Sequence, residues 1–339
     1  MRKQLSKFFI KVFLISLPIL ILLFIYIIED PFKIIYNYDS FYKSGLPQYV
    51  TLDADYVSTE TFIQNSKKYN YDSFIFGNSR TRFYEINSWK KYINSDNCYH
   101  FDGSAETLLG IVRKIDFLNR RHVKISNALI VLDYDILSQT IEKSGHLFKS
   151  HPAFTGQNRL LFQFEFFKAF LSKDFLFAYL DFKITKKFKP YMKNGHLLFD
   201  LPVKYIDRFN EIQYYTLEDQ IKKDPASYYD IEKMKVFYKR VTVQEYYPST
   251  IGNEQLKILS EISTILKTNK TKYKVILNPL YDQKKLQPLD LKILENIFGK
   301  VNVYDFSGIN SITNDFHNYY ENSHYRPHIA DSIMKNIYQ

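Results

Sequence analysis

The chain has few of the residues on which disulfide scaffolds and phosphate loops depend. Its 339 residues include one cysteine, Cys98, and only ten glycines. A single cysteine cannot form a disulfide within the chain, and no residues of the metal-ligating type accompany Cys98 at a metal-binding spacing. The sequence also has no glycine-rich phosphate loop and no internal repeat. We therefore expect neither a metal ion nor an organic cofactor.

Acidic residues are outnumbered by basic ones, 36 to 46, which gives a formal net charge of +10. A basic chain of this kind suits nucleic acid, an anionic membrane surface or an anionic polymer as partner. No zinc-ligand set and no recognisable reading motif accompany the charge, so we expect no nucleic-acid partner. Hydrophobic residues make up 45% of the chain, which is enough to bury a core.

The N-terminus has the composition of a membrane anchor. Four basic residues in the first eleven positions precede an uncharged run from Val12 to Ile28. With Phe8 to Ile10 included, the segment approaches the ~20 residues that span a bilayer. No small-residue cleavage site follows it, so an uncleaved anchor is favoured over a signal peptide. We predict a cytoplasmic tail (1–7), a single span (8–28) and a juxtamembrane segment (29–66), with the N-terminus in the cytoplasm and the rest of the chain extracytoplasmic.

Beyond the anchor, apolar strand-like runs alternate with amphipathic helical segments. This alternation predicts right-handed βαβ units and an α/β fold with a parallel sheet. The expected strands are 71–76, 97–101, 128–132, 272–280 and 301–307, and the expected helices are 86–93, 105–121, 253–269, 289–299 and 327–338. The α/β domain should comprise residues 67–145 and 251–339.

Residues 146–250 interrupt the alternation and are predicted to form an α-rich insertion. The stretch from Leu160 to Phe182 is aromatic and helical in character, but it contains four charged residues that would lie in hydrocarbon if it crossed a membrane. We expect a helix pair that covers a core, with contact to a membrane surface or a partner as the alternative.

The segment from Tyr71 to Arg82, YDSFIFGNSRTR, places a serine where a nucleophile would be useful. Gly77 allows a tight turn after the first strand, so that Ser79 lies at the carboxyl end of the sheet, where open α/β folds bind ligands. Backbone N–H groups of the following turn can stabilise a developing negative charge. The alternative is an ordinary strand–turn–helix junction with Ser79 as its N-cap.

Candidate partners for the serine lie near the C-terminus, in YENSHY just before the last helix. The loop after the last strand of a parallel sheet meets the earlier loops at the same edge. His324 is therefore placed to act as general base for Ser79, and Glu321 to orient the imidazole. A surface histidine and a solvated carboxylate are the structural alternatives.

Three features together resemble the SGNH (GDSL-like) hydrolase superfamily, and most closely its membrane-anchored bacterial envelope branch. They are GNSRT after the first strand, a D-G-S turn after the second, and a C-terminal acid-x-x-His-Tyr. The resemblance covers about Tyr71 to Leu137 and Tyr273 to Tyr338, and it implies a three-layer α/β/α domain. It also implies Ser79 as nucleophile, His324 as base, Glu321 as the acid, and an oxyanion hole made by the N–H groups of Ser79 and Gly103.

The sequence departs from the family pattern in two places. The acid is a glutamate, which makes Asp315 a competing candidate for that role. The asparagine expected after the third strand is replaced by LDYD; Asn278, after the next strand, is the candidate that could supply the amide to the oxyanion hole, although it also reads as a simple Asn-Pro turn. Arg80 and Arg82 flank the serine and either bind an anionic substrate or pair with acids of the fold.

The resemblance and the anchor together imply a membrane-anchored serine esterase or O-acyltransferase. Its substrate would be acyl esters, most simply acetyl, on an envelope polysaccharide or glycolipid. The alternative is a catalytically degenerate SGNH-like domain that binds or assembles a polysaccharide modification or export system, beside a membrane acyltransferase as partner.

Overall fold

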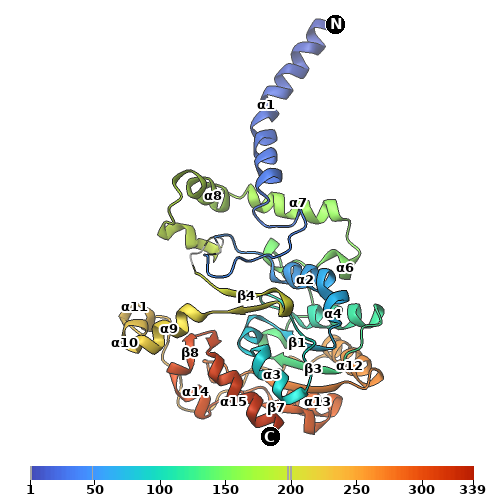
Figure 1. Cartoon of the computed structure of the whole chain (residues 1–339), viewed down its shortest axis with the longest axis vertical. Coiled ribbons are helices and arrows are strands. Elements are labelled where there is room, and N and C mark those ends of the chain that lie inside the picture. Colours follow the sequence, from blue (N-terminus) through green and yellow to red (C-terminus); the bar gives the residue numbers. More distant parts are fainter. Residues whose placement is uncertain (1, 48, 197, 199–200) are drawn as a thin grey trace.

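A five-stranded parallel sheet forms the centre of the protein (Figure 1). The computed structural model describes every residue except 1, 48, 197, 199 and 200. The strands are β1 (Ser73–Gly77), β2 (Cys98–Asp102), β3 (Asn127–Leu132), β6 (Lys272–Leu277) and β7 (Val303–Asp305). Their order across the sheet is β2-β1-β3-β6-β7, and every neighbouring pair is parallel. The predicted α/β fold with a parallel sheet is confirmed.

Helices pack on both faces of this sheet. On one face lie α2 (Ala54–Tyr69), α4 (Leu108–Arg120), α12 (Asn253–Thr268) and α13 (Pro288–Phe298). On the other lie α3 (Ile86–Ile93) and α15 (Pro327–Tyr338). Strand β3 explains why both faces need cover: Ala128, Ile130 and Leu132 enter the first core cluster, while Leu129 and Val131 enter the second. A continuous apolar run is the pattern of a strand that is buried on both sides.

Helix α1 (Arg2–Glu29) projects away from the sheet domain (Figure 1). An 18-residue stretch within its segment Gln4–Glu29 has a mean hydropathy of 2.8, and the segment is long and apolar enough to cross a membrane. The C-terminal end of α1 packs against helix α7 (Arg159–Phe170). The centroid of the Tyr26 ring lies 5.2 Å from that of Phe167 and 5.3 Å from that of Phe170. Just beyond the helix, the Asp30 carboxylate accepts three backbone N–H groups from residues 34–36.

Residues 146–250 contain the expected helices and also a small sheet that the sequence analysis did not predict. Helices α7 (Arg159–Phe170) and α8 (Lys173–Thr185) pack against the end of α1 and the juxtamembrane segment. Strands β4 (Lys204–Ile206) and β5 (Glu211–Gln213) form an antiparallel hairpin. With three residues each, these strands are too short to show a period-2 pattern in the sequence.

The remaining elements are short. They are the α-helices α5 (Tyr134–Leu137), α6 (Pro152–Thr155), α9 (Tyr215–Lys223), α10 (Pro225–Tyr228), α11 (Ile231–Met234) and α14 (Ser311–Asn314), the strands β8 (Tyr319–Glu321) and β9 (His324–Tyr325), and six 3₁₀ turns, of which Ser79–Phe83 matters most here.

Strand β5 carries a buried carboxyl group into the core. Glu211 is 1% exposed, and one of its oxygens accepts the Ile86 N–H at 2.6 Å. Burial raises the pKa of Glu211 to about 7, although the bond from Ile86 opposes the shift. The nearby His100 is fully buried, and burial lowers its pKa to about 4, so that it stays neutral. The group that titrates near neutral pH in this part of the core is therefore Glu211.

We expect Glu211 to stabilise the fold less as the pH rises from about 4.5 to about 7. Between its ordinary pKa of 4.5 and about 7, Glu211 holds a proton in the folded state that the unfolded chain has released. Its contribution to the free energy of unfolding therefore falls across this window, by up to about 3 kcal/mol. The buried, neutral His100 contributes in the opposite sense between about pH 4 and 6.5, so the measured quantity is the free energy of unfolding of the wild type minus that of Glu211→Gln. This difference should fall by that amount across the window, as measured by chemical denaturation of the full chain at several pH values.

The matched control is Glu254→Gln on α12. It makes the same change from carboxylate to amide, but at a solvent-exposed position. It should keep the wild-type pH dependence. The same pH profile in wild type and Glu211→Gln would show that Glu211 makes no such contribution.

Candidate active site

The turn after β1 places Ser79 at the carboxyl end of the sheet. Gly77 ends the strand with φ +148°, and a Cβ there would lie 2.5 Å from the carbonyl oxygen of Val131. Only glycine fits such a position without displacing β3. The Asn78 side chain then accepts the Arg80 N–H at 3.1 Å and starts a 3₁₀ turn whose first residue is Ser79. The serine is half-buried and opens onto a pocket.

The β8–β9 hairpin brings the predicted base and acid to this serine. Glu321 and His324 are partners across the hairpin. Nε2 of His324 lies 2.8 Å from Oγ of Ser79, and Nδ1 of the same ring is hydrogen-bonded to a carboxylate oxygen of Glu321. Because Nδ1 faces an acceptor, it carries the proton, and Nε2 is left to accept from the serine hydroxyl. The structure thus joins three residues whose chain positions are up to 245 residues apart.

The glutamate is held as a carboxylate. Burial alone would raise the pKa of Glu321, but the hydrogen bond and the charge of His324, together with the Ser323 N–H at 2.8 Å, lower it below its usual value. Asp315, the competing acid, lies elsewhere: its carboxylate accepts from the backbone and ring nitrogens of His317 at 2.9 and 2.8 Å. The structure therefore pairs His324 with Glu321.

Two of the three expected oxyanion donors, Gly103 and Asn278, are already bonded to other groups. The Gly103 N–H donates to the carbonyl of Gly77 at 3.2 Å. The Asn278 amide donates to Asp133 at 3.1 Å and accepts from the Tyr325 hydroxyl at 2.8 Å, and the side chain is 1% exposed. Neither residue lines the pocket that contains Ser79. The Asn278 side chain serves a buried network, so its proposed place in an oxyanion hole is not what this structure shows.

The two arginines beside the serine pair with acids of the fold. Arg80 donates to Asp133 at 2.7 Å and to the carbonyl of Ser323 at 2.9 Å. Arg82 donates to Asp102 at 3.2 Å, and it also lines the pocket. Their side chains are 11% and 16% exposed. Of the two alternatives considered for these residues, the structure shows the pairing with fold acids.

Asp133 is the site residue that sequence reasoning missed. Its carboxylate receives hydrogen bonds from Asn78, Arg80, Asn278 and the Ile136 N–H. It thereby joins the turns after β1, β3 and β6, and through Arg80 it reaches the His324 hairpin. Burial would raise the pKa of Asp133, but Arg80 and these hydrogen bonds outweigh it and keep the pKa below its usual value. The only signal in the sequence was its position directly after a buried strand.

A pocket of about 440 Å³ extends from the serine, a size typical of small-molecule sites. Apart from the site residues its walls are mostly apolar or aromatic, and many come from residues 146–250. The lining includes Phe83, Leu147, Phe148, Leu201, Tyr214, Leu217, Tyr228 and Tyr320. The segment that interrupts the α/β alternation therefore forms much of the wall around Ser79.

No protein-family model matches the chain, and no curated protein matches its sequence. Among the described residues, no group of three or more His, Cys, Asp or Glu is arranged to hold a metal ion.

Proposed function

We propose that the protein is a membrane-anchored, extracytoplasmic serine esterase or O-acyltransferase of the SGNH type, which acts on acyl esters of an envelope glycan, most simply acetyl esters. The observation that carries the proposal is the hydrogen-bonded series from Ser79 through His324 to Glu321. This is the arrangement of a nucleophile, its general base and the group that orients the base.

In the proposed reaction the serine oxygen attacks the ester carbonyl carbon while its proton moves to Nε2 of His324. Glu321 stabilises the resulting imidazolium. Collapse of the tetrahedral intermediate breaks the bond to the glycan oxygen, which takes the proton from His324, and leaves the acyl group on Ser79. Water, or a second hydroxyl group in the case of transfer, then attacks the acyl-enzyme with the same histidine as base.

The negative charge of the intermediate needs donors, and these differ from the pair that the resemblance implied. Among the described residues, the N–H groups of Ser79, Ser104 and Ala105 have no hydrogen-bond acceptor. All three residues line the pocket. We assign the oxyanion site to the Ser79 N–H and to an N–H of Ser104–Ala105, in place of Gly103 and Asn278.

The anchor supports the proposed location. The basic residues in the first part of α1, before its apolar run, favour a cytoplasmic N-terminus, which would place the pocket on the outer face of the membrane. Helices on both faces of the parallel sheet support the three-layer arrangement of the SGNH type. An envelope polysaccharide or glycolipid is the substrate class that such a location makes accessible.

One observation favours a second candidate function, a degenerate SGNH-like domain that binds or assembles a modification or export system with a membrane acyltransferase. The observation is that the Gly103 N–H and the Asn278 amide already donate hydrogen bonds within the fold. Such a protein would keep the Ser79–His324 geometry without turnover.

A fluorophosphonate probe, which reacts with activated serines, separates the two functions. We expect the wild type to be labelled and Ser79→Ala to be unlabelled, with acetate released from purified envelope polysaccharide by the wild type alone. Ser227→Ala, which removes an exposed serine from α10, should be labelled like the wild type. Equal labelling of wild type and Ser79→Ala would refute the enzyme assignment, and absent labelling of the wild type would favour the binding function.

A further inference from the structure

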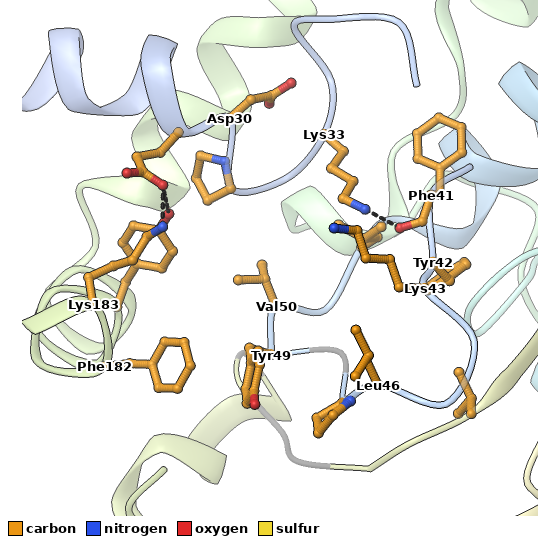
Figure 2. A pocket seen from close by; sticks show the side chains of 16 residues that line it. Asp30, Lys33, Phe41, Tyr42, Lys43, Leu46, Tyr49, Val50, Phe182 and Lys183 are labelled. Atoms are coloured by element: carbon orange, nitrogen blue, oxygen red, sulfur yellow. Dashed lines mark hydrogen bonds and ion pairs between the residues drawn. The ribbon is translucent and has the colours of Figure 1, made fainter. Parts of the chain in front are cut away.

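A second pocket, of about 430 Å³, lies where α1 leaves its apolar segment (Figure 2). Its lining comes from the end of α1, the juxtamembrane segment and α8, and is separate from the lining of the Ser79 pocket. One wall is apolar and aromatic, with the rings of Tyr49 and Phe182 in contact at 4.4 Å between centroids. The opposite wall carries charge.

Two lysines on the charged wall lack an acidic partner. Figure 2 shows the ammonium groups of Lys33 and Lys43 directed toward the same part of the pocket. Lys33 is half-buried and donates to the Phe41 carbonyl, and neither lysine forms an ion pair with a described residue. The third lysine of the pocket, Lys183, differs because it is paired with Glu29.

Asp30, an acid that also lines the pocket, forms no ion pair with either of these two lysines. Asp30 uses its carboxylate to accept the N–H groups of residues 34–36 and the Tyr38 hydroxyl. Burial lowers the pKa of Lys33, and the charge of Lys43 lowers it further, while Asp30 offsets part of the shift. Lys33 is partly buried and Lys43 is exposed; their like charges repel each other, and a bound anion would relieve that repulsion.

Helix α7, beside this pocket, has an exposed apolar face that indicates contact with lipid. Leu160, Phe164 and Phe167 are spaced three and four residues apart and therefore share one face of the helix. Phe167 contacts Tyr26 of α1, and Leu160 and Phe164 are 75% and 53% exposed. Figure 1 shows α7 crossing below the end of α1. An apolar face turned toward the base of a membrane-crossing helix is suited to the lipid interface.

We propose that this second pocket binds an anionic phospholipid of the surrounding leaflet. The phosphate lies between the ammonium groups of Lys33 and Lys43, and the glycerol and upper acyl carbons lie against Tyr49 and Phe182. The position at the end of α1 supplies the lipid, and the charge of the pocket selects a headgroup with net negative charge. The site is independent of Ser79, so it stands or falls separately from the proposed enzyme activity.

The test measures lipid retained by the full-length protein, in detergent, by native mass spectrometry. The probes are phosphatidylglycerol, phosphatidylcholine of the same chain length, and inorganic phosphate. We expect one phosphatidylglycerol per chain, with affinity about tenfold or more above that for phosphatidylcholine. Binding should be at least about tenfold weaker in the Lys33→Gln/Lys43→Gln double variant, because two charge-assisted hydrogen bonds are lost.

The matched control is Lys173→Gln/Lys187→Gln, which removes two exposed lysines on and just after α8 that do not line the pocket. It should bind phosphatidylglycerol like the wild type. Equal losses in both double variants would reduce the effect to general charge attraction and overturn the site. Equal binding of phosphatidylcholine, or displacement of the lipid by inorganic phosphate, would overturn the lipid assignment. Unfolding temperatures and Ser79 labelling should be unchanged in both variants.

Discussion

Replacement of His324 by alanine should lower the rate of ester cleavage by on the order of 10⁴-fold. The change removes the acceptor for the Ser79 proton, which lies 2.8 Å from the serine oxygen. Glu321→Gln should cost nearly as much, about 10³- to 10⁴-fold, because an amide cannot hold the imidazole in the required tautomer and stabilise its charge. The rates are measured as acetate release from envelope polysaccharide or from a small acetyl ester.

Asp315→Ala is the decisive comparison for this prediction. Sequence reasoning left Asp315 and Glu321 as competing acids, and the structure pairs Asp315 with His317 instead. We expect Asp315→Ala to retain most of the wild-type rate. A loss as large as that of Glu321→Gln would mean that the acid has been assigned to the wrong residue.

Asp133→Ala should lower the free energy of unfolding by about 3–5 kcal/mol. The substitution leaves the Arg80 guanidinium, whose side chain is 11% exposed, without its main partner, and it removes the acceptor for the Asn78 and Asn278 amides. A buried charge deprived of its partner costs far more than an exposed pair. Denaturant titration of the full chain in detergent measures the effect.

The neighbouring Asp135→Ala is the control for Asp133. Asp135 is also an acid near Arg80, at 3.6 Å, but its side chain is 61% exposed. Its removal should cost no more than about 1 kcal/mol of the free energy of unfolding. Similar costs for the two variants would show that the buried network contributes no special stability.

The stabilisation by Asp133 also has a pH dependence. Because the pKa of Asp133 is held below its usual value, the stabilisation is complete at neutral pH and is lost only as the pH falls through that lowered pKa.

The strands of the sheet were predictable because burial on both faces leaves an unmistakable pattern. The run from Ala128 to Leu132 is apolar at every position, and the structure buries each of them. Ser79 and His324 were predictable as neighbours for a related reason: the ends of parallel strands and the loops that follow them meet at one edge. Gly77 also indicated where the first strand ends, since the turn after β1 requires glycine.

Other parts of the site were not predictable from local pattern. Asp133 matters through partners in two distant turns, after β1 and after β6, and no local window of sequence contains them. The pocket walls from residues 146–250 were not predicted. Phenylalanine and tyrosine, 29 of each, are so frequent in this chain that an aromatic residue does not indicate which side chains line a pocket. The Gly103 N–H was expected at the oxyanion site, but its bond to Gly77 extends the β1–β2 ladder by one step.

The packed junction between α1 and α7 has a mechanical consequence. A protein on a flexible stalk would sweep a wide volume, whose radius grows with linker length. Here the Tyr26 ring packs against Phe167 and Phe170, and Glu29 forms an ion pair with Lys183, so that in the proposed orientation Ser79 lies at one fixed height above the bilayer. For the proposed esterase, the accessible glycans would be those that their synthesis or export delivers to this one level of the envelope.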